Sequence, residues 1–187
     1  MHVPSPDKPA RLWTIANGLS AARLLAAFPL AAMILRSGGD AGTGALLVYL
    51  LAALSDAADG YIARARGEVS SLGAALDPVA DKLFGLLVFY ALVQAGVLPA
   101  ALLVLLLFKE AALLAGGALL LRGTGRVISA RPLGKAATVL LFTSFALILA
   151  GYSGAGAFLT ALGVLCSLAA GIDYAWVAAR MRGTSAG

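Results

Sequence analysis

The sequence is poor in cysteine, histidine and charge. It has one cysteine, Cys166, so an intrachain disulfide is excluded. Its one histidine, His2, lies beside the first residue, and no convincing nucleophile–histidine triad is visible. Charged residues make up only 12% of the chain and aromatic residues 7%. No strand-like alternation, internal repeat or low-complexity tract stands out, so nothing indicates a β or repeat architecture.

Hydrophobic residues take the place of the missing charge. They make up 61% of the 187 residues, and the mean hydropathy is +0.94. Runs such as Leu98–Phe108 and Val139–Ala150 exceed what a soluble core requires. We therefore expect an all-α integral membrane protein with one domain. The net charge of +5 could indicate nucleic-acid binding. In so apolar a chain it favours membrane orientation and contact with anionic lipid, and no nucleic-acid partner is expected.

Stretches of about twenty apolar residues, separated by Gly, Pro or charge, predict six transmembrane helices. They cover approximately Leu19–Leu35, Gly44–Ala63, Ala74–Ala95, Leu98–Leu121, Leu133–Ala150 and Ala155–Ala178. Residues 1–18 are predicted to form an N-terminal interfacial helix, and residues 179–187 a short basic tail. The basic residues before the first apolar stretch suggest a signal peptide, but no convincing cleavage site follows, so we expect a retained first helix.

Basic residues are concentrated in alternate connections between the predicted spans. They lie in the N-terminal segment, after spans two and four, and at the C-terminus: Lys8, Arg11, Arg23, Arg64, Arg66, Arg122, Arg126, Arg131, Lys135, Arg180 and Arg182. The other connections hold only Arg36. By the positive-inside rule, both termini face the cytoplasm. We expect a multi-pass protein of the bacterial inner (plasma) membrane, with its active site on the cytoplasmic side.

Four aspartates lie within "SDAADGYIARARGEVSSLGAALDPVADK" (55–82). Asp56 and Asp59 are three residues apart near the cytoplasmic end of span two, and Asp77 and Asp81 are four apart near the start of span three. Each pair therefore shares a helix face, and the short connection makes the two helices antiparallel neighbours. Converging carboxylates repel one another unless hard divalent cations such as Mg²⁺, Mn²⁺ or Ca²⁺ bind between them. Two such ions about 4 Å apart can clamp an in-line phosphoryl displacement.

Two other interpretations of the aspartates stay open from the residues alone. The aspartates could pair with Arg64, Arg66 and Lys82 or lie in headgroup water, although four on facing surfaces are hard to explain so. A carboxylate cluster could also bind a transported cation or relay protons, which would make the protein a cation transporter. A bound polyanion is favoured by the small residues beside the carboxylates: Gly60, Ala63 and Gly73. Arg64 could pair with phosphate oxygens of such a ligand.

The pattern D-x₂-D-G-x₂-A-R-x₈-G-x₃-D-x₃-D, from Asp56 to Asp81, resembles the complete signature of the CDP-alcohol phosphotransferase family. The resemblance implies a small six-helix membrane enzyme, usually homodimeric, with an N-terminal interfacial helix. Such enzymes transfer a phosphoalcohol group from a CDP-linked donor to a hydroxyl acceptor and release CMP.

The resemblance also implies roles for the residues of the signature. Two divalent cations, Mg²⁺ or Mn²⁺, would be held by four ligands: Asp56, Asp59, Asp77 and Asp81. Asp81 would in addition be the catalytic base that takes the proton of the acceptor hydroxyl. The cytidine nucleotide would be accommodated by the small residues: Gly60, Ala63 and Gly73. Arg64 would meet the diphosphate.

Two further segments, "LDPVADK" (76–82) and "IANGLSAARLLAAFP" (15–29), resemble the branch of phosphatidylglycerophosphate synthases and cardiolipin synthases. Both use CDP-diacylglycerol. The phosphatidylglycerophosphate synthases often carry an Arg-Glu pair in span four and a second arginine eight residues after the arginine of that pair. In this sequence, Lys109-Glu110 takes the place of the pair and Gly117 that of the second arginine. We expect glycerol-3-phosphate as the acceptor, giving phosphatidylglycerophosphate, with phosphatidylglycerol, giving cardiolipin, as the alternative. Candidate acceptor-binding residues are Lys109, Arg131 and Lys135, although Lys109 and Glu110 could equally form a buried structural pair.

Overall fold

The computed structural model describes residues 15–39, 42–66, 71–124 and 132–183; within them, the side chains at 15–17, 19, 56–66, 71–78, 119–124 and 181–183 are not described. Six α-helices follow one another: α1 (Ile15–Arg36), α2 (Gly42–Arg66), α3 (Ser71–Gln94), α4 (Ala100–Thr124), α5 (Pro132–Leu149) and α6 (Ser153–Gly183). Each predicted span overlaps one helix, and these ranges contain no strand. The prediction of an all-α fold is confirmed for the described part of the chain.

Every helix extends past at least one boundary that hydropathy predicts, and two of them reach into the predicted terminal segments. Helix α1 begins at Ile15, within the predicted interfacial segment, and α6 continues beyond Ala178 to Gly183, into the predicted basic tail. Residues 1–14, which make up most of the predicted interfacial segment, lie outside the described residues. Helix ends follow backbone hydrogen bonding and packing, whereas hydropathy marks only the apolar part of a helix.

Short turns capped by glycine end α3 and α5 in the same way. Gly96 has a φ of 77° and Gly151 a φ of 91°, a left-handed conformation that costs glycine little. After α3, the amide of Gly96 donates to the Val93 carbonyl, and the amide of the next residue donates to the Leu92 carbonyl, both at 3.0 Å. The equivalent pair of bonds follows α5. This Schellman arrangement satisfies the last carbonyls of each helix and reverses the chain within a few residues.

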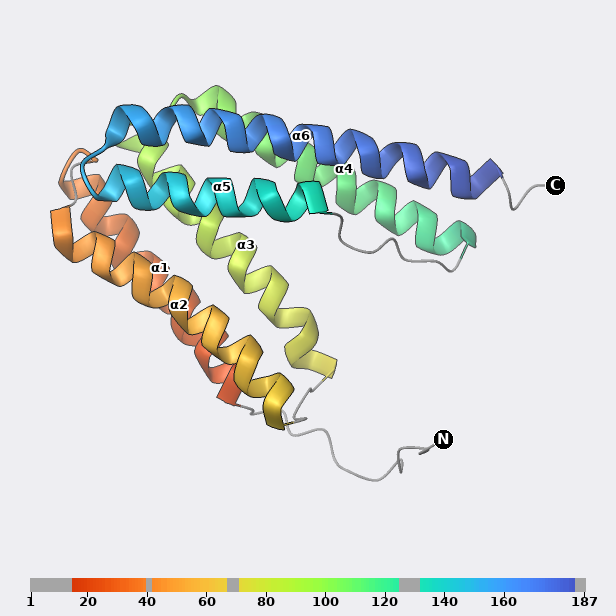
Figure 1. The fold of residues 1–187 in the computed structure, drawn as a ribbon, viewed down its shortest axis with the longest axis horizontal. Helices are drawn as coiled ribbons and strands as arrows, with labels where there is room; N and C mark the ends of the chain where they lie inside the picture. The colour runs from red at the N-terminus through yellow and green to blue at the C-terminus, as the bar shows by residue number, and fades with distance from the viewer. Residues whose placement is uncertain (1–14, 40–41, 67–70, 125–131, 184–187) are drawn as a thin grey trace.

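The six helices converge at the end that holds these turns and diverge towards the end where α1 begins and α6 ends (Figure 1). Helix α1 packs against α2 and α3, and α6 packs against α4 and α5. Aromatic side chains join the two groups. The ring centroids of Tyr49 of α2 and Phe142 of α5 lie 6.0 Å apart, and those of Phe89 of α3 and Phe145 of α5 lie 5.4 Å apart. Within the first group, Tyr49 stacks on Phe84 of α3 with ring centroids 5.8 Å apart. The backbone of α3 packs against α1 and not against α2, so the prediction that α2 and α3 pack directly together is not confirmed for the described residues.

Small residues allow α5 and α6 to pack closely. A Cβ atom built on Gly156 would lie 2.4 Å from a side-chain carbon of Ile148 and 2.8 Å from the Ser144 carbonyl oxygen. A Cβ on Gly163 would lie 3.0 Å from Leu141. Glycine at these positions lets the two helices approach nearly to backbone contact, which is a common way to associate helices in lipid.

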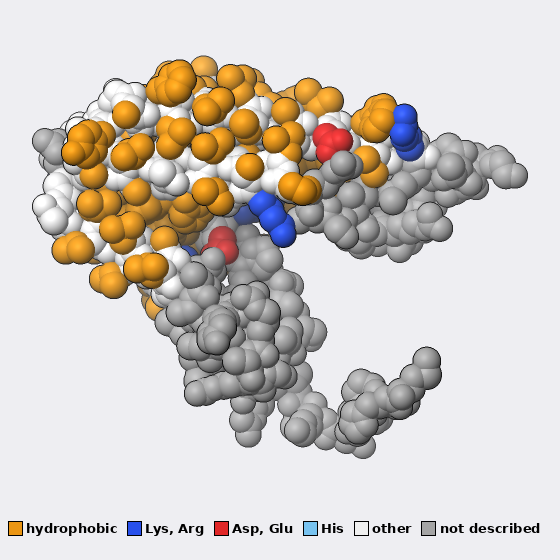
Figure 2. All heavy atoms as spheres, in the orientation of Figure 1, with side chains coloured by type: hydrophobic (Ala, Val, Ile, Leu, Met, Phe, Trp, Pro, Cys, Tyr) orange, Lys and Arg blue, Asp and Glu red, His pale blue; other side chains and the backbone are white. Residues whose placement is uncertain are grey.

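The outer surface of the described residues is apolar. Figure 2 shows hydrophobic side chains spread over α5 and α6, with few charged groups among them. Many large apolar side chains are exposed, including Phe158, Phe108, Ile172, Leu114 and Leu25. Within the described residues, three segments are long and apolar enough to cross a membrane: Ala100–Ala118, Pro132–Leu149 and Ser153–Arg180. The fold is that of a membrane protein, since a soluble protein rarely exposes so much contiguous apolar surface.

Candidate active site

Both aspartate pairs lie in helical backbone. Asp56 and Asp59 belong to α2, and Asp77 and Asp81 to α3. The side chains of Asp56, Asp59 and Asp77 are not among the described ones. The same holds for the surroundings of the predicted nucleotide-binding positions: Gly60, Ala63, Arg64 and Gly73. Among the described side chains, no three His, Cys, Asp or Glu residues lie together. The two-metal cluster therefore stays a prediction, carried by helical backbones that give each pair the expected spacing.

Asp81 is the member of the quartet whose side chain is described. Its carboxylate forms an ion pair with the Arg23 guanidinium of α1. The Arg23 Nε also donates a hydrogen bond of 3.2 Å to the Ala52 carbonyl of α2. Arg23 is 3% exposed, so its charge lies in the protein interior and is stabilised by these contacts. One side chain of α1 thus contacts both helices that carry the aspartates.

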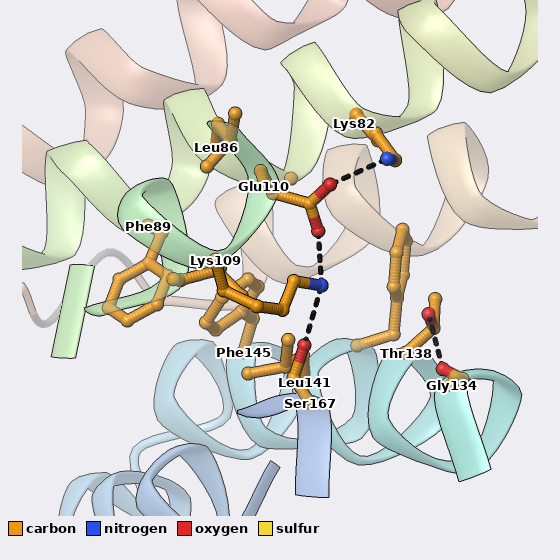
Figure 3. Close-up of a pocket in the computed structure, with 13 residues that line it drawn as sticks. Lys82, Leu86, Phe89, Lys109, Glu110, Gly134, Thr138, Leu141, Phe145 and Ser167 are labelled. Carbon is orange, nitrogen blue, oxygen red and sulfur yellow. Dashed lines mark hydrogen bonds and ion pairs between the residues drawn. The ribbon is translucent and has the colours of Figure 1, made fainter. Parts of the chain in front are cut away.

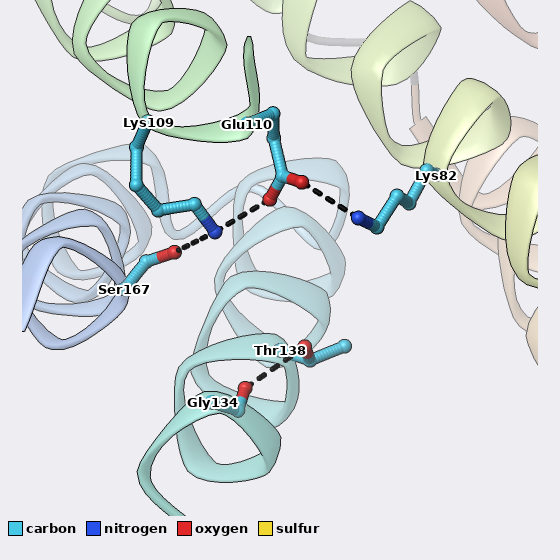
Figure 4. Close-up of polar contacts among 6 residues, drawn as sticks. All are labelled: Lys82, Lys109, Glu110, Gly134, Thr138 and Ser167. Atoms are coloured by element: carbon cyan, nitrogen blue, oxygen red, sulfur yellow. Dashed lines mark hydrogen bonds and ion pairs between the residues drawn. The ribbon is translucent and has the colours of Figure 1, made fainter. Parts of the chain in front are cut away.

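A second charged network begins at the next residue of α3. Lys82 donates to one carboxylate oxygen of Glu110 at 2.6 Å, and Lys109 contacts the other oxygen at 2.5 Å (Figure 4). Lys109 also donates to the Ser167 hydroxyl of α6 at 2.9 Å. The network connects α3, α4 and α6 through polar groups in an otherwise apolar environment. It confirms that Lys109 and Glu110 form a pair, and it adds Lys82 as a third member.

This network forms one wall of a pocket of about 130 Å³. Helices α3, α4, α5 and α6 supply the lining residues: Lys82, Gly85, Leu86, Phe89, Leu106, Lys109, Glu110, Gly134, Thr138, Leu141, Phe142, Phe145 and Ser167. Figure 3 shows the Lys109 and Lys82 ammonium groups turned towards Glu110, with Phe89, Leu141 and Phe145 on the apolar side. Two lysines for one glutamate give the wall a net positive charge. The pocket therefore suits a small ligand that carries an anionic group.

The predicted acceptor residues are placed differently from one another. Lys109 lines the pocket. Lys135 is exposed in the first turn of α5, whereas Gly134 and Thr138 beside it line the pocket, and the Thr138 hydroxyl donates to the Gly134 carbonyl at 3.1 Å. Arg131 lies outside the described residues.

Sequence reasoning missed the parts played by Arg23, Lys82 and Ser167. It treated Arg23 only as part of the basic N-terminal segment. The available signal was the position of Arg23 inside an apolar stretch, because a charge there is costly and usually has a specific partner. Lys82 directly follows Asp81, but its partner Glu110 lies 28 residues further along the chain. Ser167 is one serine among several in apolar helices, and nothing in its local sequence marks it.

Comparison with known proteins places the chain in one family. Residues 13–170 match the model of the CDP-alcohol phosphatidyltransferase family. The chain belongs to this family, and the resemblance seen in the aspartate signature is confirmed.

Relatives within the family carry two names. A cardiolipin synthase (CMP-forming) of Streptomyces coelicolor is 42% identical over 142 residues, which is 74% of this chain and 66% of the relative. A CDP-diacylglycerol--glycerol-3-phosphate 3-phosphatidyltransferase of Bacillus subtilis is 40% identical over 95 residues, 51% of this chain and 48% of the relative. One with the same name from Cereibacter sphaeroides is 47% identical over 73 residues, 37% of this chain and 32% of the relative. The matched segments thus span between 32% and 66% of the length of these relatives.

Proposed function

We propose that this protein transfers the phosphatidyl group of CDP-diacylglycerol to a hydroxyl acceptor and releases CMP. The observation that carries the proposal is the ion pair between the Asp81 carboxylate of α3 and the buried Arg23 guanidinium of α1. Asp81 completes the signature that begins with the aspartates of α2. Membership in the CDP-alcohol phosphatidyltransferase family supports the reaction class. The alternative of a cation transporter has no comparable support.

The proposed reaction assigns Asp81 the role of base. The acceptor oxygen forms a bond to the phosphatidyl phosphorus, and the bond from that phosphorus to the oxygen of the CMP phosphate breaks. The proton of the acceptor hydroxyl goes to the Asp81 carboxylate, and CMP leaves with the electron pair of the broken bond. General-base assistance of this kind typically contributes about 10²–10⁴-fold to the rate.

The chemistry of the donor set fits two divalent cations. The quartet offers only carboxylate oxygens, the ligands that Mg²⁺ and Mn²⁺ prefer. Cations bound there would neutralise the diphosphate of the donor and the phosphate of departing CMP. We assign the four aspartates as ligands, and Gly60, Ala63, Arg64 and Gly73 to nucleotide and diphosphate binding.

The proposed setting is the cytoplasmic side of a bacterial plasma membrane. The six helices alternate in direction between the turn-containing end and the opposite end (Figure 1). At the end where α1 begins and α6 ends, α2 and α4 also end and α3 and α5 begin. The basic residues of the sequence gather near these helix ends, so that end would face the cytoplasm. We propose six transmembrane passages by one homodimeric domain, with both termini cytoplasmic.

For the acceptor we propose glycerol-3-phosphate, and the product is then phosphatidylglycerophosphate. The support is the pocket between α3, α4, α5 and α6, whose wall carries Lys82, the residue after Asp81, and Lys109 against one glutamate. A small cavity with net positive charge suits a phosphorylated alcohol. The relatives from Bacillus subtilis and Cereibacter sphaeroides are named for this reaction, and they align with 51% and 37% of this chain. Lys109 would contact the phosphate from the pocket wall, and Arg131 and Lys135 from the start of α5.

Phosphatidylglycerol is the second candidate acceptor, and two observations favour it. Gly117 stands where phosphatidylglycerophosphate synthases often carry an arginine, so one expected phosphate contact is missing. The alignment with the Streptomyces cardiolipin synthase also covers more of this chain, 74%, than the alignments with the two phosphatidyltransferases of the other name. The product would then be cardiolipin.

Product analysis separates these candidates. Purified protein in lipid nanodiscs receives labelled CDP-diacylglycerol, Mg²⁺ or Mn²⁺, and either glycerol-3-phosphate or phosphatidylglycerol. We expect labelled phosphatidylglycerophosphate with the first acceptor. Cardiolipin formation from the second, without product from the first, would establish the second candidate. The absence of any lipid product and of CMP with both acceptors would contradict the proposed function.

A further inference from the structure

The orientation of the protein in the membrane does not by itself explain why Arg23 is buried. Basic residues that orient a membrane protein lie in the connections or near the surface, whereas Arg23 is 3% exposed and lies more than two turns into α1. A buried guanidinium is costly unless each of its donors finds an acceptor. Arg23 has acceptors on two other helices, the Asp81 carboxylate of α3 and the Ala52 carbonyl of α2.

Both acceptors lie at the candidate site. Asp81 is the predicted base and metal ligand. Ala52 precedes Asp56 by four residues, one helical turn, so the Ala52 carbonyl is also the helical acceptor of the Asp56 amide. The Ser55 hydroxyl donates to the same carbonyl at 2.8 Å. Arg23 therefore contacts α2 at the turn that begins the first aspartate pair and α3 at the last residue of the second pair.

The position of Arg23 between helices allows it to set the distance between the two aspartate pairs. Helix α1 packs against both α2 and α3. The guanidinium is a planar fork whose donors keep a fixed geometry. One donor bound to α2 and another bound to α3 therefore fix the separation of these helices at the level of the aspartates.

We propose that Arg23 is a positioning residue of the active site: it sets the direction of the Asp81 carboxylate and the spacing between the two aspartate-bearing helices, and thereby the affinity of the quartet for divalent cations. This inference rests on the proposed function, because it takes the quartet as the metal-binding group. Arg23 makes no contact with the reacting atoms in this role. Its effect passes through Asp81 and through the backbone of α2.

The test is Mn²⁺ binding to the purified full-length protein in nanodiscs, followed by electron paramagnetic resonance of free and bound Mn²⁺. Partners that orient metal ligands typically change metal affinity by about 10–100-fold when they are removed. We expect Arg23→Gln to raise the Mn²⁺ dissociation constant by about that factor and to broaden the bound spectrum. Arg23→Lys keeps the charge but cannot bridge both acceptors, so we expect a loss of at least about 10-fold.

Arg36→Gln is the matched control, since Arg36 is an exposed arginine at the far end of the same helix. It should leave Mn²⁺ affinity unchanged. In an Asp81→Asn background, Arg23→Gln should add little further loss, because the two residues act through one contact. Size-exclusion elution and thermal unfolding report whether each variant is folded.

The outcomes are distinct. Wild-type Mn²⁺ affinity in a folded Arg23→Gln or Arg23→Lys variant would overturn the positioning role alone. Failure of both variants to fold would also overturn it, since Arg23 would then serve the fold rather than the site. Absence of Mn²⁺ binding by the unaltered protein would refute the metal site of the proposed function, and the inference with it.

Discussion

Glu110→Gln removes one charge from the network that connects α3, α4 and α6. The substitution keeps the size of the side chain and a hydrogen-bonding amide. In the native protein Glu110 accepts from Lys82 at 2.6 Å and contacts Lys109 at 2.5 Å. The two lysines differ in environment, since the Lys109 side chain is 13% exposed and that of Lys82 is 58% exposed. After the substitution, the Lys109 ammonium keeps the Ser167 hydroxyl as its described acceptor but lacks a counter-charge.

The burial of Lys109 determines how much stability the protein loses when Glu110 is replaced. Breaking a buried ion pair from one side typically costs about 3–5 kcal/mol, because the remaining charge is left uncompensated. Glu110 is 19% exposed, so we expect a cost of about 2–4 kcal/mol in the free energy of unfolding. For a protein of this size, 1 kcal/mol corresponds to about 2–4 °C in Tm. Glu110→Gln should therefore lower Tm by roughly 4–16 °C.

The assay is thermal unfolding in one detergent, with Lys82→Met as the control. Lys82 is exposed, so its loss should cost less than about 1 kcal/mol. The double variant Lys109→Met/Glu110→Leu should be milder than Glu110→Gln, because it leaves no buried charge without a partner. Equal shifts for Glu110→Gln and Lys82→Met, or the largest shift for the double variant, would refute this reasoning.

Lys109→Met then separates a structural from an acceptor-binding role. If Lys109 binds the phosphate of the acceptor, the variant should raise the acceptor KM by the equivalent of about 1.5–3 kcal/mol, the value of a charged hydrogen bond. The KM for CDP-diacylglycerol should then change little. A lowered Tm with an unchanged acceptor KM would show that the pair is structural only.

Three further predictions follow from packing, orientation and charge. Gly156→Ala should destabilise the protein by about 1–3 kcal/mol, because its Cβ meets α5 at 2.4 Å, whereas Gly154→Ala, with open space around it, should not; equal Tm values would contradict the close α5–α6 packing. In a Cys166→Ala background, an impermeant thiol reagent applied outside intact cells should label Ser153→Cys and not Lys135→Cys, and the reverse pattern would invert the topology. Lys135→Ala should raise the acceptor KM by the equivalent of about 1.5–3 kcal/mol if Lys135 holds the acceptor phosphate, and steady-state kinetics showing no change would limit it to orienting the protein.

Local features of the sequence predicted the helices well, for a physical reason. A stretch of twenty apolar residues can satisfy its backbone in lipid only as a helix or a closed barrel, so length and hydropathy are sufficient signals. The turns follow equally local rules, since Gly96 and Gly151 can adopt the left-handed conformation that ends α3 and α5. Boundaries were less predictable, as the start of α1 at Ile15 and the end of α6 at Gly183 show.

Contacts between distant residues were not predictable from one sequence. The spacing of Asp77 and Asp81 indicates one helix face, but nothing in it indicates that Arg23, 58 residues earlier, pairs with Asp81. The Lys109–Ser167 bond spans the same separation. Such pairs depend on which helices pack together, and a chain in which nearly every helix is apolar on most sides gives little sign of this packing.

The most direct test of the central claim is CMP release by the purified protein under controlled supply of donor, acceptor and metal. The account predicts CMP only when CDP-diacylglycerol, a hydroxyl acceptor and Mg²⁺ or Mn²⁺ are all present. A chelator should abolish the release, added metal should restore it, and Asp59→Asn should be inactive while eluting as a folded protein. Full turnover in excess chelator would contradict the two-metal account, and cation flux without CMP release would favour a transporter instead.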